Sequence, residues 1–137
     1  MREILFRGKS KHNGEWAEGN LFAQDDVVTI LPTPTNIGTG FGGSWWIDDG
    51  FYPVAPETVG QYTGLTDIGG NRIFEGDIMK TAVTGLTPHT GVVEFADGAF
   101  GLRCTDGAAY FLCFVAGSFT IIGNVHDTPE LTKEAAQ

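Results

Sequence analysis

Basic residues are scarce in this sequence of 137 residues, which holds 8 lysines and arginines against 17 aspartates and glutamates, for a formal net charge of −9. Proteins bind nucleic acids largely by neutralising phosphates with basic side chains. This charge balance therefore argues against a nucleic-acid-binding surface. Only residues 1–12 are locally basic, and there Arg7, Lys9 and Lys11 could form a small patch.

Cysteines and long apolar runs are also few. Cys104 and Cys113 are the only two cysteines and form no Cys-x-x-Cys pair. We expect both to be buried free thiols, because a chain of this length and apolar content needs no disulfide to fold. No apolar run approaches the roughly 20 residues of a membrane-spanning helix. The first residues also lack the apolar stretch of a signal peptide, so we expect a soluble cytoplasmic protein.

Recognisable catalytic and metal-binding motifs are missing as well. His12, His89 and His126 are scattered, with no His-x-His or His-Glu-x-x-His spacing. The sequence also contains no Gly-x-Ser-x-Gly and no phosphate-binding Gly-Lys-Ser/Thr. Asp77, which follows Gly76, is interpreted as a carboxylate that accepts backbone amides at the entrance of a strand. We therefore expect no catalytic residue, no metal site and no cofactor.

Glycine, in contrast, is abundant, with 20 residues, and 10 phenylalanines accompany it. The phenylalanines indicate a real core, so most glycines are interpreted as turns between strands. Asn13-Gly14 is such a turn dipeptide, because both residues tolerate a positive φ. It predicts a hairpin over residues 3–22, and the β-branched run over 27–31 predicts the next strand.

The second half of the chain has the clearest strand pattern. Three short turns separate strands predicted over 91–95, 99–104, 110–115 and 119–125, which would form a four-stranded antiparallel meander. We expect one face of it to be buried, that of Val93, Phe95, Phe100, Leu102 and Cys104. Pro129 fits the first turn of a short C-terminal helix.

These patterns together predict a mainly β protein of two regions. An N-terminal β-hairpin region over residues 1–58 is followed by a small SH3-like antiparallel β-barrel over residues 59–137, which ends in the short helix. The barrel is a fold analogy, drawn from the strand that starts at Gly76-Asp77-Ile78 and the tight turns that follow it. It says nothing about a ligand.

Residues 32–53 differ from the rest, because glycines and large aromatic residues gather there. The candidate interaction residues are Phe41, Trp45, Trp46, Phe51 and Tyr52. Aromatic side chains are enriched at interface centres, since they bury a large area for little loss of side-chain entropy. Two alternatives stay open: the rings pack on the chain's own core, or they contact a second subunit or another protein.

The run over residues 54–80 is unusually specific. It begins Val-Ala-Pro-Glu-Thr-Val-Gly-Gln-Tyr-Thr-Gly-Leu-Thr-Asp and ends Gly-Asn-Arg-Ile-Phe-Glu-Gly-Asp-Ile-Met-Lys. With Phe6-Arg7 before it and Val93-Glu94-Phe95, Ile122-Gly123-Asn124 and Pro129-Glu130-Leu131 after it, the chain resembles the YopX-like family of bacteriophage and prophage proteins. Two places depart from the family's pattern: Gly8-Lys9-Ser10-Lys11, where a tryptophan and an acidic residue are common, and residues 32–53.

The resemblance implies a mostly β fold, a phage origin and the cytoplasm of a bacterial host, and it implies no reaction. We expect a non-enzymatic phage or prophage accessory protein that forms a homo-oligomer and acts by binding a host or phage protein. An alternative is a regulatory protein that binds nucleic acid or imitates DNA with its acidic surface. An enzyme is the third hypothesis, and the absence of a catalytic motif argues against it.

Overall fold

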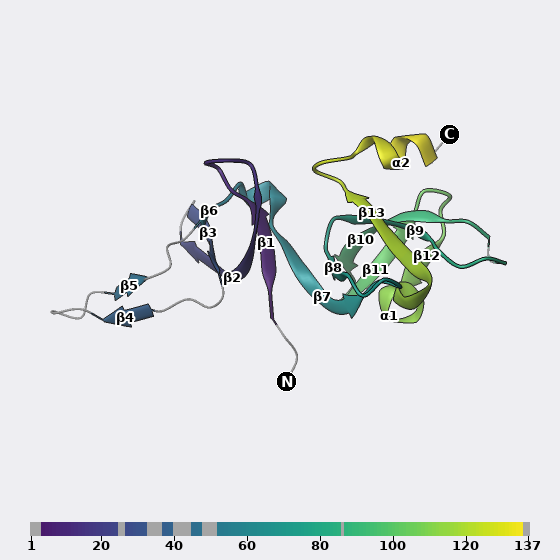
Figure 1. Ribbon diagram of the computed structural model, residues 1–137. Helices are drawn as coiled ribbons and strands as arrows, with labels where there is room; N and C mark the ends of the chain where they lie inside the picture. The colour runs from purple at the N-terminus through teal and green to yellow at the C-terminus, as the bar shows by residue number, and fades with distance from the viewer. Residues whose placement is uncertain are drawn as a thin grey trace. The chain divides into compact units, whose positions relative to one another are not determined.

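The computed structural model describes residues 4–24, 27–32, 37–39, 45–47, 52–85 and 87–135, and the chain divides into two compact units between Gln61 and Tyr62. Both units are built on antiparallel strands, and a short helix follows the last strand (Figure 1). The prediction of a mainly β fold with a short C-terminal helix is confirmed. None of the helices within the described ranges has the length and apolar character needed to cross a membrane.

The first unit is a sheet with the strand order β6-β3-β2-β1-β7. Its elements are β1 (Phe6–Lys9), β2 (Trp16–Gln24), β3 (Val27–Pro32), β4 (Ile37–Thr39), β5 (Trp45–Ile47), β6 (Tyr52–Pro53), the 3-10 turn η2 (Pro56–Thr58) and β7 (Gly60–Thr66), which continues into the second unit. The predicted hairpin is confirmed, because β1 pairs with β2, and the predicted third strand pairs with β2 in turn. Ile30 and Val54 are fully buried in this unit.

The second unit is a sheet with the strand order β12-β11-β10-β9-β13, and β8 pairs with the end of β7 beside it. Its elements are β8 (Arg72–Phe74), β9 (Asp77–Thr81), β10 (Thr90–Ala96), β11 (Ala99–Cys104), β12 (Ala109–Phe111), α1 (Leu112–Val115), the 3-10 turn η3 (Ala116–Ser118), β13 (Phe119–Asn124) and α2 (Glu130–Ala135). Buried side chains such as Ile73, Met79 and Leu102 form its core. The strand order gives this sheet two ends, β12 and β13, and its closure into an SH3-like barrel stays a prediction.

The predicted four-stranded meander is wrong beyond its second hairpin. β10 pairs with β11 and β11 with β12, but Leu112–Val115 forms the helix α1 instead of continuing the strand. β13 then pairs with β9 at the other end of the sheet. The run from Tyr110 to Val115 is apolar at every position, so it lacks the period of two that distinguishes a strand from a helical turn.

The predicted buried face is confirmed for Val93, Leu102 and Cys104, Phe100 is partly buried against the core, and the prediction is wrong for Phe95. Phe95 lies opposite Phe100, next to the turn that joins β10 to β11. Their rings meet edge to face with centroids 5.1 Å apart, and Phe95 is exposed. The alternation is therefore correct, but the core ends before the tip of the hairpin.

Two aspartates fix the backbone of the family-like run. The Asp67 carboxylate accepts hydrogen bonds from the backbone amides of Gly69 and Asn71, both at 2.9 Å, and from that of Ile121 in β13 at 3.1 Å. Asp77 is buried and accepts the Phe74 amide at 2.8 Å, as predicted for a carboxylate at a strand entrance. Glu75 and Gly76 form the turn between Phe74 and Asp77. Gly76 has a φ of 89°, a conformation that glycine favours.

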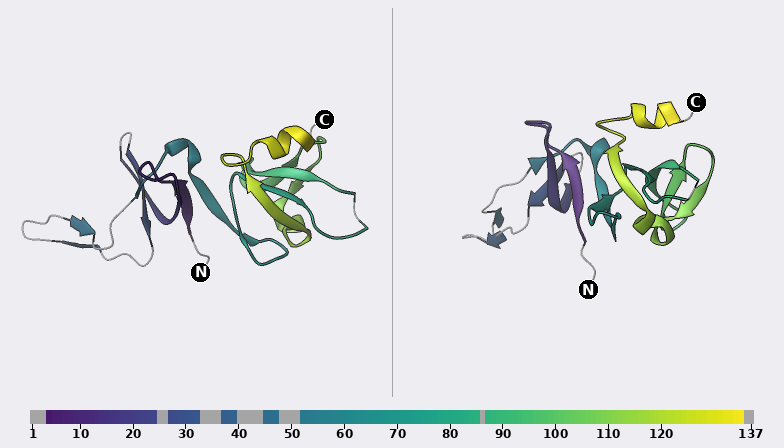
Figure 2. Two further views of the ribbon diagram at one scale, coloured as in Figure 1. Left: turned by 45° about the horizontal axis from the view of Figure 1, so that its top comes forward. Right: turned by 45° about the vertical axis from the view of Figure 1, so that its right-hand side comes forward.

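The C-terminal helix α2 is joined to β13 by a hydrogen-bonded turn, and Figure 2 shows it beside the sheet of the second unit in both views. Thr128 Oγ1 accepts the Asn124 amide at 3.1 Å. Asn124 Oδ1 accepts the amides of His126 and Asp127 at 3.0 and 2.9 Å. These bonds place the start of the helix where Pro129 predicted it.

Candidate functional site

The aromatic residues that the sequence singled out lie largely beyond the described part of the chain. Phe41 and Phe51 are outside the described residues. Trp45 and Trp46 form part of β5 and Tyr52 part of β6, but only their backbone is described. The hypothesis that these five side chains form an interaction site therefore stays a prediction.

A second group of aromatic residues, which the sequence did not single out, is exposed in the second unit. We call it the aromatic surface: Phe111 and Phe114. Phe111 is 60% and Phe114 80% exposed, and their rings pack edge to face with centroids 6.1 Å apart. Large apolar side chains exposed side by side, rather than singly, are typical of an interaction site.

A hollow of about 270 Å³ adjoins this surface on one face of β10, β11 and β12. The register Glu94↔Gly101↔Phe111 places the small residues Ala96, Ala99, Gly101 and Ala109 on that face, and they form the floor of the hollow. Phe111 and an ion pair line it, with Arg103 Nη2 3.2 Å from Glu94 Oε2. The hollow can therefore receive an apolar side chain beside a nearly neutralised charge pair.

The strand β12 forms one end of the five-stranded sheet. Among the described strands, only β11 pairs with it, so its other edge presents backbone donors and acceptors. Its sequence, Ala109-Tyr110-Phe111, contains neither the lysine nor the proline that commonly protects an edge strand from pairing with another chain. This edge is therefore open to a further strand.

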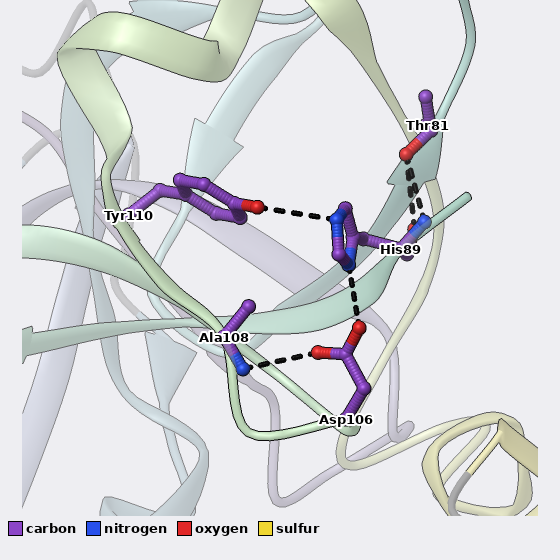
Figure 3. Close-up of polar contacts among 5 residues, drawn as sticks. All are labelled: Thr81, His89, Asp106, Ala108 and Tyr110. Carbon is purple, nitrogen blue, oxygen red and sulfur yellow. Dashed lines mark hydrogen bonds and ion pairs between the residues drawn. The ribbon is translucent and has the colours of Figure 1, made fainter. Parts of the chain in front are cut away.

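A polar cluster lies where β10 and β11 begin and end, and we call it the His89 cluster: His89, Cys104, Asp106 and Tyr110. His89 Nδ1 is 2.7 Å from Asp106 Oδ2, and the Tyr110 hydroxyl is 3.1 Å from His89 Nε2 (Figure 3). The Cys104 thiol, the His89 ring and the Asp106 carboxylate each place one ligand atom within 4.8 Å of the others. A nitrogen, a sulfur and an oxygen donor are thus brought together.

Backbone hydrogen bonds hold each member of this cluster. The His89 amide donates to Thr81 Oγ1 at 2.9 Å, and the Thr81 amide donates to the His89 carbonyl at 3.0 Å. Cys104 and Asp106 lie in a tight turn, in which the Cys104 amide donates to the Ala108 carbonyl at 2.7 Å. The backbone of both segments, at His89 and over residues 104–108, is therefore held by hydrogen bonds independently of the contacts between the side chains.

The two acidic groups of the cluster are shifted in opposite directions. A hydrogen bond from the Ala108 amide, and then the His89 ring, hold the pKa of Asp106 below its ordinary value, although partial burial opposes this. Burial, and then the negative charge of Asp106, raise the pKa of the Cys104 thiol. Cys104 is thus a protonated, weakly nucleophilic thiol at neutral pH, unlike the thiolate that nucleophilic catalysis requires.

The prediction of two buried free thiols is confirmed for Cys104 and wrong for Cys113, which is free but exposed. Cys113 lies in α1, so it does not follow the alternation that a strand over 110–115 would impose. One face of this short helix contributes Leu112 to the core, while Cys113 and Phe114 face outward.

The His89 cluster was missed because His89 lies 15 to 21 residues before the other three members, in no known motif. The signal was the register of the hairpin. Gly91 pairs with Cys104, and the Thr105 amide donates to the Thr90 carbonyl at 2.9 Å. Continuing the same register by one more residue brings His89 opposite Asp106. A hairpin prediction with the register of its turn would have placed these two side chains together.

Comparison with known proteins confirms the resemblance seen in the sequence. The family model described as YopX protein matches residues 5–133, nearly the whole chain. The chain belongs to the YopX family. The crystal structure of protein EF1440 from Enterococcus faecalis is similar to this YopX family chain, with 25% identity and a TM-score of 0.62 over 96% of this chain and 99% of that chain.

A second solved structure shows the same fold at a lower sequence identity. The X-ray crystal structure of protein yopX from Bacillus subtilis has 14% identity and a TM-score of 0.53, over 96% of this chain and 97% of that chain. No curated protein matches this YopX family sequence. The comparisons therefore give the family and the fold.

Proposed function

We propose that this YopX family chain is a non-enzymatic phage or prophage accessory protein that works in the host cytoplasm by protein–protein association. Its first partner is a second copy of the same chain, bound through the aromatic surface and the hollow beside it. The phage origin and the cytoplasmic location rest on the family resemblance. The association rests on the exposed aromatic side chains of the second unit.

The observation that carries this proposal is a projecting aromatic pair next to an apolar hollow. Phe114 is 80% exposed, and it packs against Phe111, which lines the hollow. In a symmetric dimer each residue that contacts a partner residue is itself contacted in return. A surface with a projection and a hollow side by side can therefore place Phe114 of each copy in the hollow of the other.

Charge also favours this face for self-association. Two copies of a chain with a net charge of −9 repel one another. The charged residues that line the hollow are Glu94, Asp97 and Arg103, of which Glu94 and Arg103 form an ion pair. The repulsion between two such faces is small, because only one of the negative charges is left without a nearby opposite charge.

The test is the molar mass in solution, measured by size-exclusion chromatography with light scattering over a range of concentrations. Wild-type chain is expected to be a dimer, and the double variant Phe111→Ser/Phe114→Ser a monomer. Burial of a phenylalanine side chain contributes about 1.5–3 kcal/mol, so the loss of two phenylalanines weakens association about a hundred-fold or more. A wild-type chain that stays monomeric at several hundred micromolar would contradict the proposal.

Phe22 offers a matched control for the double variant. It is 57% exposed, close to the 60% of Phe111, but it lies on β2 in the first unit. Phe22→Ser removes an apolar area comparable to that of Phe111 alone without touching the hollow, so this variant is expected to remain a dimer. Dissociation of Phe22→Ser to the same extent as the double variant would show that the aromatic surface is not the interface.

Nucleic-acid binding is a second candidate function, favoured by one observation in the first unit. The Arg7 guanidinium carbon lies 4.6 Å and the Lys9 ammonium 5.6 Å from the centroid of the Trp16 ring. Trp16 is partly exposed, and basic side chains beside an accessible aromatic ring are typical of surfaces that bind single strands. A gel shift that weakens with salt and is lost in Arg7→Ala/Lys9→Ala would support this candidate; no shift at low salt would dismiss it.

A further inference from the structure

The His89 cluster has no role in the proposed protein–protein association, but its side chains are of the types that bind metal ions. We propose that His89, Cys104 and Asp106 bind one zinc ion, with Nδ1 of His89, Sγ of Cys104 and one carboxylate oxygen of Asp106 as ligands; the Cys104 thiol releases its proton to solvent as the Zn–S bond forms. One ligand atom of each of these residues already lies within 4.8 Å of those of the other two. Zinc takes nitrogen, sulfur and oxygen donors of these three residue types.

The geometry requires only a small adjustment. Zinc lies about 2.0–2.3 Å from such ligands, so two ligands at a tetrahedral angle are roughly 3.4–3.6 Å apart. His89 Nδ1 and Asp106 Oδ2 are now 2.7 Å apart, and the ligand atoms of the three residues all lie within 4.8 Å of one another. Moves of about 1 Å thus suffice, and Asp106 can make them, because half of its side chain is exposed.

The surroundings of the ligands match those of a metal site. A histidine that binds a metal through one ring nitrogen usually donates the other ring N–H to a nearby oxygen. The Tyr110 hydroxyl lies 3.1 Å from His89 Nε2 and is placed to accept that bond. The other oxygen of the Asp106 carboxylate accepts the Ala108 amide at 3.0 Å, so this ligand has a hydrogen-bond partner as well.

The donor set selects the kind of ion. Calcium and magnesium prefer oxygen ligands, whereas a thiolate beside an imidazole favours zinc and other thiophilic ions. Three protein ligands leave a fourth tetrahedral position, which water would fill. The competing interpretation is a buried cysteine beside an unrelated His–Asp hydrogen bond, since free cysteines are often buried for packing alone.

Cobalt(II) is the probe that separates the two interpretations. Thiolate coordination to cobalt(II) gives an intense charge-transfer band in the near ultraviolet, and a tetrahedral site gives visible d–d bands. Titration of the full chain, reduced and free of metal, is expected to produce both, to saturate at one ion per chain and to be reversed by zinc. Absence of the charge-transfer band at saturating cobalt would overturn the proposal.

The two cysteines provide matched variants. Cys104→Ser is expected to abolish the charge-transfer band, while Cys113→Ser, which changes the exposed thiol in α1, keeps it. The band surviving in Cys104→Ser, or vanishing in Cys113→Ser, would contradict the assignment. Because Cys104 is buried, His89→Gln serves as a second variant if the serine variant does not fold by circular dichroism. It is expected to lower zinc affinity at least about 100-fold.

Two further variants separate this site from its neighbours. Tyr110→Phe removes the hydroxyl that orients His89, and it is expected to weaken zinc binding about 10-fold while the thiolate band persists. The monomeric variant Phe111→Ser/Phe114→Ser is expected to bind cobalt as the wild type does, because all three ligands come from one chain. Failure of dimerisation and failure of metal binding are therefore observed independently.

Discussion

Asp67 is the residue for which the structure predicts the most specific loss of stability. It is only 4% exposed, and its two carboxylate oxygens accept three backbone amides and the Asn71 side chain. Oδ1 accepts within the turn, from Gly69 and Asn71, while Oδ2 accepts the Ile121 amide of β13, 54 residues away. One carboxylate thus shapes a turn and fastens it to a distant strand.

The substitution Asp67→Asn keeps the shape of this side chain but replaces one acceptor oxygen with a donor. With its oxygen toward the turn, the new NH₂ group faces the Ile121 N–H. A partly buried amide left without an acceptor costs about 1–3 kcal/mol, and the turn keeps neutral hydrogen bonds in place of charged ones. We expect a loss of about 2 kcal/mol, which lowers the melting temperature of a unit of this size by about 10 °C.

Asp97→Asn is the matched control. Asp97 is exposed, in the turn between β10 and β11, and its φ of 54° is one that asparagine also tolerates. Both substitutions remove one negative charge from the same acidic chain, so relief of general repulsion is similar in the two variants. Asp97→Asn is expected to change the free energy of unfolding by less than about 0.5 kcal/mol, as for an ordinary surface position.

The pH dependence of the free energy of unfolding provides a second, independent test of the role of Asp67. Burial would raise the pKa of Asp67, but its hydrogen bonds, led by that from the Asn71 amide, outweigh burial and lower it. A lowered pKa in the folded state means that the ionised carboxylate stabilises the fold above its unfolded pKa of about 3.9. This contribution is lost as the pH falls through the lower folded value.

Urea unfolding followed by circular dichroism from pH 7 to pH 3 measures both effects. The difference between wild type and Asp67→Asn is expected to stay constant down to about pH 4.5 and to shrink below about pH 4. An Asp67→Asn variant as stable as Asp97→Asn at pH 7, or a difference that grows on acidification, would refute the reasoning.

Two smaller predictions concern the thiols and the C-terminal helix. A thiol reagent at pH 8 is expected to modify Cys113 rapidly and Cys104 only after unfolding, since Cys104 is buried and the pKa of its thiol is raised; equal rates for both in the folded chain would contradict this. A Cβ at Gly123 would collide with Thr128 Oγ1 and lie 3.0 Å from Leu131 Cδ1, whereas one at Gly117 meets nothing within 4 Å. Gly123→Ala is thus expected to lower stability by about 1–3 kcal/mol and Gly117→Ala to leave it unchanged, and thermal unfolding distinguishes them.

Local patterns in the sequence predicted the strands whose two faces differ. β10 and β11 alternate buried and exposed residues, and the turn between them carries Asp97-Gly98, so their hairpin could be predicted. The run from Tyr110 to Val115 is apolar throughout, so its sequence does not distinguish a buried face from an exposed one. Its division into β12 and α1 depends on the burial of Leu112 in the core. The pairing of β13 with β9 likewise joins strands that are far apart in the sequence, and no local sequence pattern predicts it.

Candidate sites were harder to predict, because each depends on register. His89 meets Asp106 only through continuation of the β10–β11 pairing, and the floor of the hollow consists of small residues on one face of three strands. Neither arrangement leaves a contiguous motif. The aromatic residues that did stand out in the sequence, such as Trp45 and Trp46, lie where side chains are not described.

Two aspartates of the family-like run over residues 54–80 have structural roles. Asp67 holds its own turn and β13, and Asp77 holds the Phe74 amide. None of the residues of the aromatic surface or the His89 cluster falls in this run. The two candidate sites are therefore to be tested outside this run, over residues 89–114.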